Sequence, residues 1–534
     1  MNKRIISAIL ILIMTVGLGF NAFVDFDAEA SDSTLAQKIV KRDEPSDDTL
    51  VIWYTDPTLE EYISDTILSF RQDTGKDVQM ELVQGVDYLE NINAASVRGE
   101  GDFPAPDLYI TTHDNLMKAY LAGLAAPILN KDEVVCDNNF PSTALHAVSC
   151  DGKYVAYPLY YETNFLLYNK TYMSSIAQGT IESEADSQEG QDAQASADAG
   201  DIDKDKGELS DEEKENAEKI LENAAEDGSL DEQTSDEGTD GLEEPYGDED
   251  AEADQEVLDR LATMIPSTID DVITFANNYN APDEVEAVLK WDITDIFYNY
   301  FFVGNFMEVG GEDGDNNSIF NLYNSQAVEC LKKYQDMNRY FSMEEDDDYN
   351  SILQQFIDGK LVFTIATTDA FAKISEAQLE NKFNYEYGVA VIPDVSKLLQ
   401  SRGLSVTDVI AVNGYSEKKE VANEFASRLS FDSADTLYNK AGKLACKREV
   451  PYENAEINNV MTEYQKSMPL PKMIETSNFW LQLEIAFSKV WSGEDPDAIL
   501  VELSDRMGGQ IEEITYSIPV QESIGAGVQT FFTK

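Results

Sequence analysis

Histidine and cysteine are scarce in this chain: its 534 residues include two histidines and four cysteines. No cysteine pair has the spacing of zinc ligands, so the sequence indicates no metal site and no cofactor. Cys136 and Cys150 flank a short predicted helix and lie close enough in sequence to form a disulfide, a pairing that the sequence leaves open. Cys330 falls within an amphipathic helix, and we expect it to be buried as a free thiol.

Positive charge is also in short supply, since 38 basic residues face 102 acidic ones and the formal net charge is −64. A surface of this sign repels the phosphates of nucleic acids, which excludes nucleic acid as a partner. It also disfavours electrostatic docking on anionic lipid. Acidity on this scale is typical of an exposed soluble protein but names no partner.

Long apolar runs are few, and the one near the N-terminus has the features of an export signal. Two basic residues precede the apolar run Ile5–Phe20, and the A-x-A-like site Ala28–Ala30 follows it. We predict that residues 1–30 are either a signal peptide or an uncleaved membrane anchor, and that 31–48 form a polar spacer. No cysteine lies near residues 15–30, so we do not expect a lipoprotein attached through an N-terminal cysteine. Either alternative places the rest of the chain on the extracellular face of the cell membrane.

Two common hydrolase motifs are missing: the chain contains neither G-x-S-x-G nor H-E-x-x-H. A secreted carbohydrate-cleaving enzyme could still use Glu162 with Asp114 or Asp369 as its acid and base. Acidic residues are so abundant that such a pair is expected from composition alone, so this alternative is the weakest that we retain.

The most informative stretch is Asp151–Met173, in which two short apolar runs are predicted to form strands joined by a bend. We place the stop of the first strand at Pro158, and the bend brings together Tyr160, Tyr161 and Glu162. Aromatic rings beside a carboxylate suit a sugar, because a sugar has an apolar C–H face and a rim of hydroxyls. The alternative is a buried tyrosine pair with a solvated glutamate.

Before and after that stretch, predicted strands alternate with predicted helices. Leu50–Trp53 is a short apolar run that suits a buried strand, and the next helix begins after Asp56 and Pro57. Leu108–Ile110 is a later strand of the same kind. Such alternation indicates parallel sheets covered by helices, in which ligands bind at the carboxyl ends of the strands. Here those ends carry Asp56 and the segment Thr111–Asp114.

Residues 174–264 interrupt this pattern, because they are strongly acidic and almost without aromatic residues, a composition that cannot bury a core. We predict an acidic, disordered insertion in which Ser210–Ala225 alone is able to form a solvated helix. The aromatic segment Trp291–Phe302 is expected to be a buried helix. A final helix is predicted over 497–511, and residues 512–534 are a tail without a clear pattern.

The order of these elements resembles that of the extracellular solute-binding proteins of ABC importers, specifically the maltodextrin-binding type. The motifs that carry the resemblance are LVIWYTD (Leu50–Asp56), PDLYITTHDN (Pro106–Asn115), YPLYYETNFLLYNK (Tyr157–Lys170), FIDGKLVFTIA (Phe356–Ala366), YGVAVIPD (Tyr387–Asp394), YSEKKEVANEFASRLS (Tyr415–Ser430) and MPLPKMIETSNFWLQLEIAFSKVWSG (Met468–Gly493). The resemblance implies an α/β fold of two lobes, each a mainly parallel sheet flanked by helices, joined by a hinge and closing on a ligand. It assigns 49–160 and 404–455 to an N-terminal lobe, and 161–173, 265–403 and 456–511 to a C-terminal lobe, with crossings at 157–164, near 400–408 and near 455.

The resemblance also implies a set of ligand-binding residues. Glu162 matches the acid that binds sugar hydroxyls, Asp114 the acid after an N-lobe strand, and Trp480 a stacking ring. Together with the residues indicated above, the predicted ligand-binding set is Asp56, His113, Asp114, Tyr160, Tyr161, Glu162, Tyr298, Tyr300, Asp369 and Trp480. Two departures matter for the ligand, since Thr111 and Asp369 stand where the maltodextrin-binding type has aromatic platforms. They favour a smaller or more polar ligand than a linear maltodextrin.

We therefore expect a monomer that captures a small molecule, a mono- or oligosaccharide, and delivers it to the permease subunits of an ABC transporter without chemical change. The alternative is a surface sensor or adhesin that uses the same clamp and transports nothing.

Overall fold

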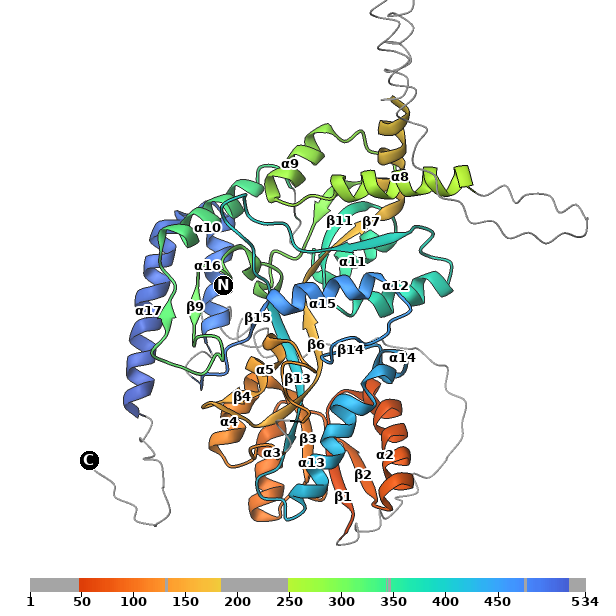
Figure 1. Ribbon diagram of the computed structural model, residues 1–534. Helices are drawn as coiled ribbons and strands as arrows, with labels where there is room; N and C mark the ends of the chain where they lie inside the picture. Colours follow the sequence, from red (N-terminus) through yellow and green to blue (C-terminus); the bar gives the residue numbers. More distant parts are fainter. Residues whose placement is uncertain are drawn as a thin grey trace, which may run out of the picture. The chain divides into compact units, whose positions relative to one another are not determined.

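The computed structural model of the protein describes residues 48–129, 133–183, 248–341, 343, 347–474 and 478–517, without the side chains of 248–254 and 509–517 (Figure 1). The chain divides into two compact units, one made of residues 1–169 and 266–534, the other of 170–265. Within the described residues, no helix is both long enough and apolar enough to cross a membrane. The predicted export segment 1–30 lies outside the described part of the chain.

The N-terminal lobe of the first unit is built on a seven-stranded sheet. Its order is β14 (Leu444–Ala445), β6 (Ala156–Thr163), β13 (Leu404–Val412), β3 (Leu108–Thr112), β1 (Leu50–Tyr54) and β2 (Val78–Leu82), with β15 (Met468–Pro469) also pairing with β13. β1 is parallel to both β2 and β3, as its uninterrupted apolar sequence predicts, and all five of its residues are buried. The long strand β13 runs antiparallel to β3 and β6, so the sheet is mixed rather than mainly parallel.

Helices cover this sheet with the apolar faces that the sequence predicts. In α2 (Glu60–Thr74) the buried residues include Tyr62, Ile63, Ile67 and Phe70, and the helix ends at Gly75 with a φ of 71°. The other helices of this lobe are α3 (Tyr88–Asn93) continued by η2 (Ala94–Arg98), α4 (Leu116–Leu121), α5 (Ser142–Val148), α13 (Lys419–Ser427) continued by η6 (Arg428–Asp432), and α14 (Leu437–Ala441), with the short turns η1 (Pro57–Leu59), η3 (His113–Asn115) and η7 (Ala434–Thr436). A two-stranded hairpin, β4 (Ser149–Cys150) with β5 (Lys153–Tyr154), leads into β6.

The C-terminal lobe is built on a four-stranded sheet of order β12 (Tyr387–Ala390), β7 (Phe165–Asn169), β11 (Leu361–Ala366) and β8 (Ala287–Lys290). β11 is parallel to β8, whereas β7 is antiparallel to both of its neighbours. The helices of this lobe are α9 (Ile269–Asn278), α10 (Ser325–Met337), α11 (Tyr349–Ile357), α12 (Ala370–Leu379), α15 (Glu456–Lys466), α16 (Phe479–Trp491) and α17 (Pro496–Ser517), with a hairpin of β9 (Glu308–Val309) and β10 (Phe320–Asn321).

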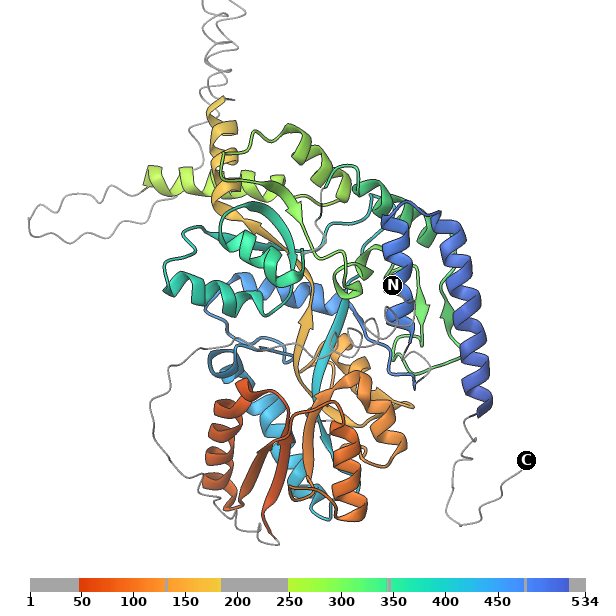
Figure 2. The same cartoon turned by 180° about the vertical axis from the view of Figure 1, so that it is seen from behind.

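Paired strands join the two lobes. β6 and β13 lie side by side in Figures 1 and 2, and β6 continues through Asn164 into β7 of the other sheet. The chain returns from β12 to β13 shortly before Leu404, close to the predicted crossing near 400–408. α15, which begins at the third predicted crossing, contacts both β12 and β6.

Two local predictions differ from the structure. Pro158 does not stop a strand: β6 passes straight through it, because the pairing with β13 shifts by one residue there, opposite Asp408 and Val409. Such a bulge accommodates a residue that has no N–H to donate. The segment Trp291–Phe302 forms two 3₁₀ turns, η4 (Ile296–Tyr298) and η5 (Tyr300–Phe302), rather than one helix, since aspartate side chains accept from backbone N–H groups at its turns.

The acidic segment is helical at both ends, contrary to the prediction of a disordered insertion. In the second unit, residues 170–183 are helical, and α8 spans Asp248–Met264. Ser210–Ala225, the predicted solvated helix, lies outside the described residues.

All four cysteines are free thiols, so the structure does not contain the Cys136–Cys150 disulfide that the sequence left open. Cys150 is fully buried within β4, whereas Cys136 is half-buried. The prediction for Cys330 is confirmed, because it is a buried free thiol within α10.

Candidate functional site

Five polar and aromatic residues of the N-terminal lobe gather around β6, β13, the start of β14 and the end of β1. Strand pairing aligns Tyr160 of β6 with Asp408 of β13, and Glu162 follows on the same face of β6 because side chains alternate along a strand. Lys443 immediately precedes β14, and the first residue of β14, Leu444, pairs with Tyr161 of β6. The Nζ of Lys443 lies 2.8 Å from the carboxylate of Asp56. The same ammonium lies 5.2 Å from the centre of the Tyr160 ring.

Burial and charge set the protonation of these five residues. Together with Tyr349, Thr367, Asp369 and Lys373 of the C-terminal lobe, described below, we call them the interlobe cluster. Burial raises the pKa of Asp408 to about 8, and the neighbouring Glu162 carboxylate adds to the effect. Burial also raises the pKa of Glu162, against the opposing influence of Lys443. For Asp56, burial alone would raise the pKa, but the charge and hydrogen bond of Lys443 and the bonds from Thr58 bring it below its usual value.

The C-terminal lobe contributes a second group around Asp369. Its carboxylate accepts from the hydroxyls of Tyr349 and Thr367, and Nζ of Lys373 lies 2.6 Å away. Burial and the adjacent Asp369 raise the pKa of Tyr349, which therefore stays protonated as a donor. The ring of Tyr349 stacks on Tyr298, with centroids 4.9 Å apart.

The two groups act on each other electrostatically. The charge of Asp369 raises the pKa of Glu162, and the charge of Lys373 lowers it. The structure thus brings together Asp56, Tyr160, Glu162 and Asp369 of the predicted set, with Tyr298 behind Tyr349. The result is a constellation of acids, lysines and aromatic rings supplied by both lobes.

Sequence reasoning missed Asp408, Lys443, Tyr349 and Lys373. Asp408 gave a signal, because it is a charged residue within the largely buried strand β13. The other three have no distinguishing pattern, since only tertiary pairing brings them to this place.

His113 is fully buried, and both of its ring nitrogens form hydrogen bonds with the protein backbone. The backbone N–H of Thr407 donates to its Nδ1 at 3.0 Å, so the ring proton lies on Nε2 and is donated to the carbonyl of Leu470 at 2.9 Å. Burial lowers the pKa of His113 to about 4, with the charge of Lys472 adding to it, so the ring is neutral. Its neighbour Asp114 has one carboxylate oxygen that is buried without a hydrogen-bond partner in the described part of the chain.

Tyr161 points to the opposite face of β6 from Tyr160 and Glu162. It is 1% exposed and stacks on Tyr464 of α15, with ring centroids 4.0 Å apart and planes at 10°. The structure therefore places Tyr161 in the core, which corresponds to the alternative of a buried tyrosine rather than to the predicted ligand contact.

Trp480 and Tyr300 lie together in the C-terminal lobe. Their rings meet edge to face at 5.6 Å; Trp480 is half-buried in the first turn of α16, whereas Tyr300 is fully buried. The hydroxyl of Tyr300 contacts the sulfur of Met468 at 3.6 Å. In this arrangement Trp480 has the exposed surface, and Tyr300 supports it from behind.

No group of three metal-ligating side chains is found among the residues that the structure describes. The interlobe cluster instead holds its carboxylates with lysines and hydroxyls, which are partners for hydrogen-bonding ligands.

Comparison with known proteins identifies the fold. The extracellular solute-binding protein of Staphylococcus aureus, solved with maltose, matches with a TM-score of 0.62 and 18% identity over 89% of this chain and 100% of its own. A cyclo/maltodextrin-binding protein solved with maltotetraose gives 0.62 and 18% over 88% and 98%. The maltose-binding periplasmic protein of Listeria monocytogenes, solved with maltose, gives 0.60 and 17% over 89% and 100%. No family model matches the sequence.

A sequence relative points in the same direction. The maltotriose-binding protein of Pyrococcus abyssi is 30% identical over 128 residues, which are 23% of this chain and 27% of that protein, so the match spans about a quarter of the relative. The chain has the two-lobe α/β fold of maltose- and maltodextrin-binding solute-binding proteins, and the predicted resemblance and fold class are confirmed at this level.

Proposed function

We propose that this protein is the extracellular substrate-binding component of an ABC importer and that it captures a carbohydrate between its two lobes. The observation that carries the proposal is the interlobe cluster, in which Glu162 of one lobe interacts with Asp369 and Lys373 of the other. A ligand that bonds to both sides favours the arrangement in which the lobes are close, and so shifts a two-state equilibrium. The solved structures of similar fold hold maltose or maltotetraose.

The composition of the cluster favours a compact polar sugar. Carboxylates and lysines accept from and donate to hydroxyls, while the half-buried Trp480 offers a face to the apolar side of a sugar ring. Two positions at which the maltodextrin-binding type has aromatic platforms carry the buried Thr111 and the half-buried Asp369 in this chain. We therefore propose a mono- or disaccharide rather than a long linear maltodextrin, bound and released without chemical change.

Ligand capture is tested by thermal unfolding of the full chain against mono- and oligosaccharides, with amino acids and metal ions as controls. A sugar at 100 times its Kd should add about 2.7 kcal/mol to the free energy of unfolding, visible as a higher melting temperature. The substitution E162Q should raise the Kd about tenfold or more, since a hydrogen bond to a charged group contributes about 1.5–3 kcal/mol. W480A should also raise the Kd, because it removes the aromatic face on which the sugar ring stacks. The exposed Glu90→Gln serves as the matched control and should leave the Kd unchanged.

Stabilisation by a sugar that survives both substitutions would place the ligand elsewhere and refute the interlobe site. Stabilisation by other ligands and by no sugar would refute the substrate class. Delivery to a permease is tested separately: cells that lack this chain should lose uptake of the labelled sugar, and uptake at the normal rate would exclude a transport role.

A further inference from the structure

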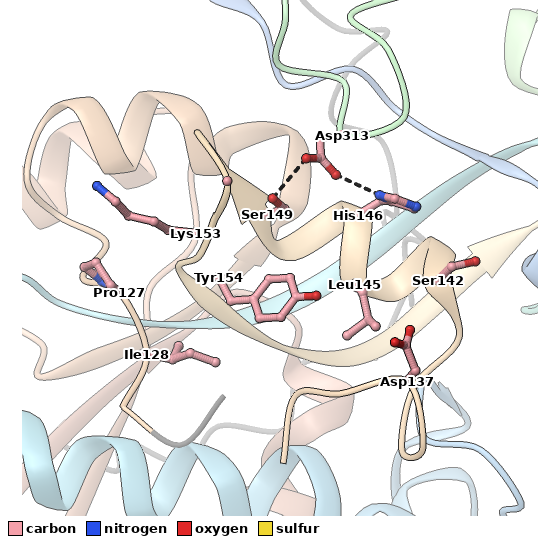
Figure 3. A pocket seen from close by; sticks show the side chains of 11 residues that line it. Pro127, Ile128, Asp137, Ser142, Leu145, His146, Ser149, Lys153, Tyr154 and Asp313 are labelled. Carbon is pink, nitrogen blue, oxygen red and sulfur yellow. Dashed lines mark hydrogen bonds and ion pairs between the residues drawn. The ribbon is translucent and has the colours of Figure 1, made fainter. Parts of the chain in front are cut away.

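A cavity of about 630 Å³ lies on the N-terminal lobe, and none of the residues of the interlobe cluster lines it. Figure 3 shows it between α5, the β4–β5 hairpin and a loop of the C-terminal lobe. Its lining residues are Pro127, Ile128, Asp137, Ser142, Leu145, His146, Ser149, Gly152, Lys153, Tyr154 and Asp313. The volume lies within the range of small-molecule sites in proteins.

One carboxylate of this cavity is held firmly in position. Asp313, from the loop between β9 and β10, accepts from Nδ1 of His146 at 2.7 Å and from the hydroxyl of Ser149 at 3.1 Å. Beneath it, the buried ammonium of Lys472 donates to the backbone carbonyls of both Asp313 and His146. About a third of the Asp313 side chain remains exposed, so its carboxylate keeps accepting capacity toward the cavity.

The rest of the lining combines an aromatic ring with apolar side chains. In Figure 3 the ring of Tyr154 crosses the middle of the cavity, with Ile128 on one side and Leu145 on the other. The exposed Asp137 lies beyond the hydroxyl end of that ring and supplies a second carboxylate. Methylene groups fit the apolar part, and an aromatic face attracts a cation.

The charges around the cavity are mainly negative. Glu312 lies 3.8 Å from Nε2 of His146, and the carboxylate of Asp315 accepts from the backbone N–H of Asp151 at the rim. The single lysine of the lining, Lys153, points away from Asp313 in Figure 3, and its Nζ donates to the hydroxyl of Tyr120 at 2.9 Å. Lys472 is covered, so its ammonium does not reach a ligand.

We propose that this cavity is a second ligand site, separate from the sugar site, and that it takes a small organic ammonium ion such as an alkyl diamine. Asp313 and Asp137, which Figure 3 shows at opposite ends of the lining, each bind one ammonium group, and Tyr154 with Leu145 and Ile128 covers the methylene chain. An anion is disfavoured by both carboxylates, and a neutral sugar carries no charge that complements that of Asp137 or of the exposed part of Asp313.

The site is tested by calorimetric titration of the full chain with putrescine at low ionic strength, in the presence of a saturating amount of any sugar found to bind. The diamine should bind with one site per chain, and D137N should raise its Kd about threefold, as loss of a partly exposed charge pair does. Y154L should raise it about threefold through the loss of the cation–π contact, and Y154F should leave it nearly unchanged. The control is D102N, which removes an exposed aspartate of the same lobe that does not line the cavity.

Equal weakening by D137N and D102N would show general attraction to an acidic protein and would overturn the proposal, as would the absence of saturable binding. Binding of glucose or succinate that depends on Asp137 would overturn the ligand class. If E162Q removes diamine binding while D137N does not, the diamine occupies the interlobe cluster and the second site is refuted. The sugar screen has its own readout, so failure of one proposal does not decide the other.

Discussion

The buried carboxyl of Asp408 makes a sharp prediction about stability and pH. Its pKa is about 8 in the folded protein and 3.8 for the unperturbed group, so the folded state binds the proton more tightly. A group of this kind contributes stability that is fully present below pH 3.8 and is lost as the pH rises through 8. Between these values each pH unit lowers the free energy of unfolding by about 1.4 kcal/mol, because one pKa unit corresponds to that energy.

The substitution D408N removes the titration while keeping the shape of the side chain. Between pH 6 and pH 8 the free energy of unfolding of the wild type should fall by about 2 kcal/mol more than that of D408N. The reason is that the carboxyl of Asp408 is already ionised in the unfolded chain over this range but not in the folded protein. Its partners Asp56, Glu162 and Lys443 stay in both proteins, so their own titration largely cancels in the comparison. Some coupling with Glu162 remains, and it acts in the same direction because removing one carboxyl makes the other easier to ionise.

The assay is urea unfolding of the ligand-free chain at pH 6, 7 and 8, followed by tryptophan fluorescence and circular dichroism. D336N, which alters an exposed aspartate of α10, serves as the control and should follow the wild type. A wild type that gains stability from pH 6 to pH 8 relative to D408N would refute the reasoning. Parallel curves for all three proteins would show that Asp408 is ionised and solvated in the folded state.

Three further predictions concern backbone space, the lysine of the cluster and the thiols. G304A should destabilise the fold by about 1–3 kcal/mol in urea unfolding, because a Cβ there would overlap the backbone carbonyl oxygen of Arg402. K443M should weaken sugar binding about tenfold or more and should raise the pH at which binding is lost as carboxyls protonate, since it removes the cation that pairs with Asp56. In the native protein a thiol reagent should label one cysteine quickly, Cys136, and all four after denaturation, because the other three are buried and free.

Each of these outcomes has a clear contrary. G179A, where a Cβ meets no atom within 4 Å, is the matched control for G304A, and equal effects would refute the steric argument. Sugar affinity that is unaltered in K443M would remove the lysine from the binding site. If only two of the four thiols are labelled after denaturation without reductant, the protein contains a disulfide that is absent from this structure.

The sequence predicted helices and strands well where apolar spacing and turn residues over a few positions determine them. The apolar run at Leu50 forms the buried strand β1, and α2 buries the predicted face and ends at its glycine. Glu162 and Tyr160 were found because an acid beside aromatic rings in an apolar stretch is unusual for a core strand. Their neighbour Tyr161 was misassigned, since a bend was expected where β6 in fact continues and alternation sends the middle side chain to the other face.

The sequence by itself determined the α/β alternation, the acidic charge and the positions of several cluster residues, because hydrophobic spacing and turn residues act over a few positions. Only the tertiary structure decided what meets Glu162. The charge of Lys443 acts on Glu162 because β14 pairs with β6, and that of Asp369 acts on it although Asp369 lies in the second lobe, each far away along the chain. Long-range strand pairing and burial set these contacts and the pKa of Asp408, and no local pattern encodes either of them.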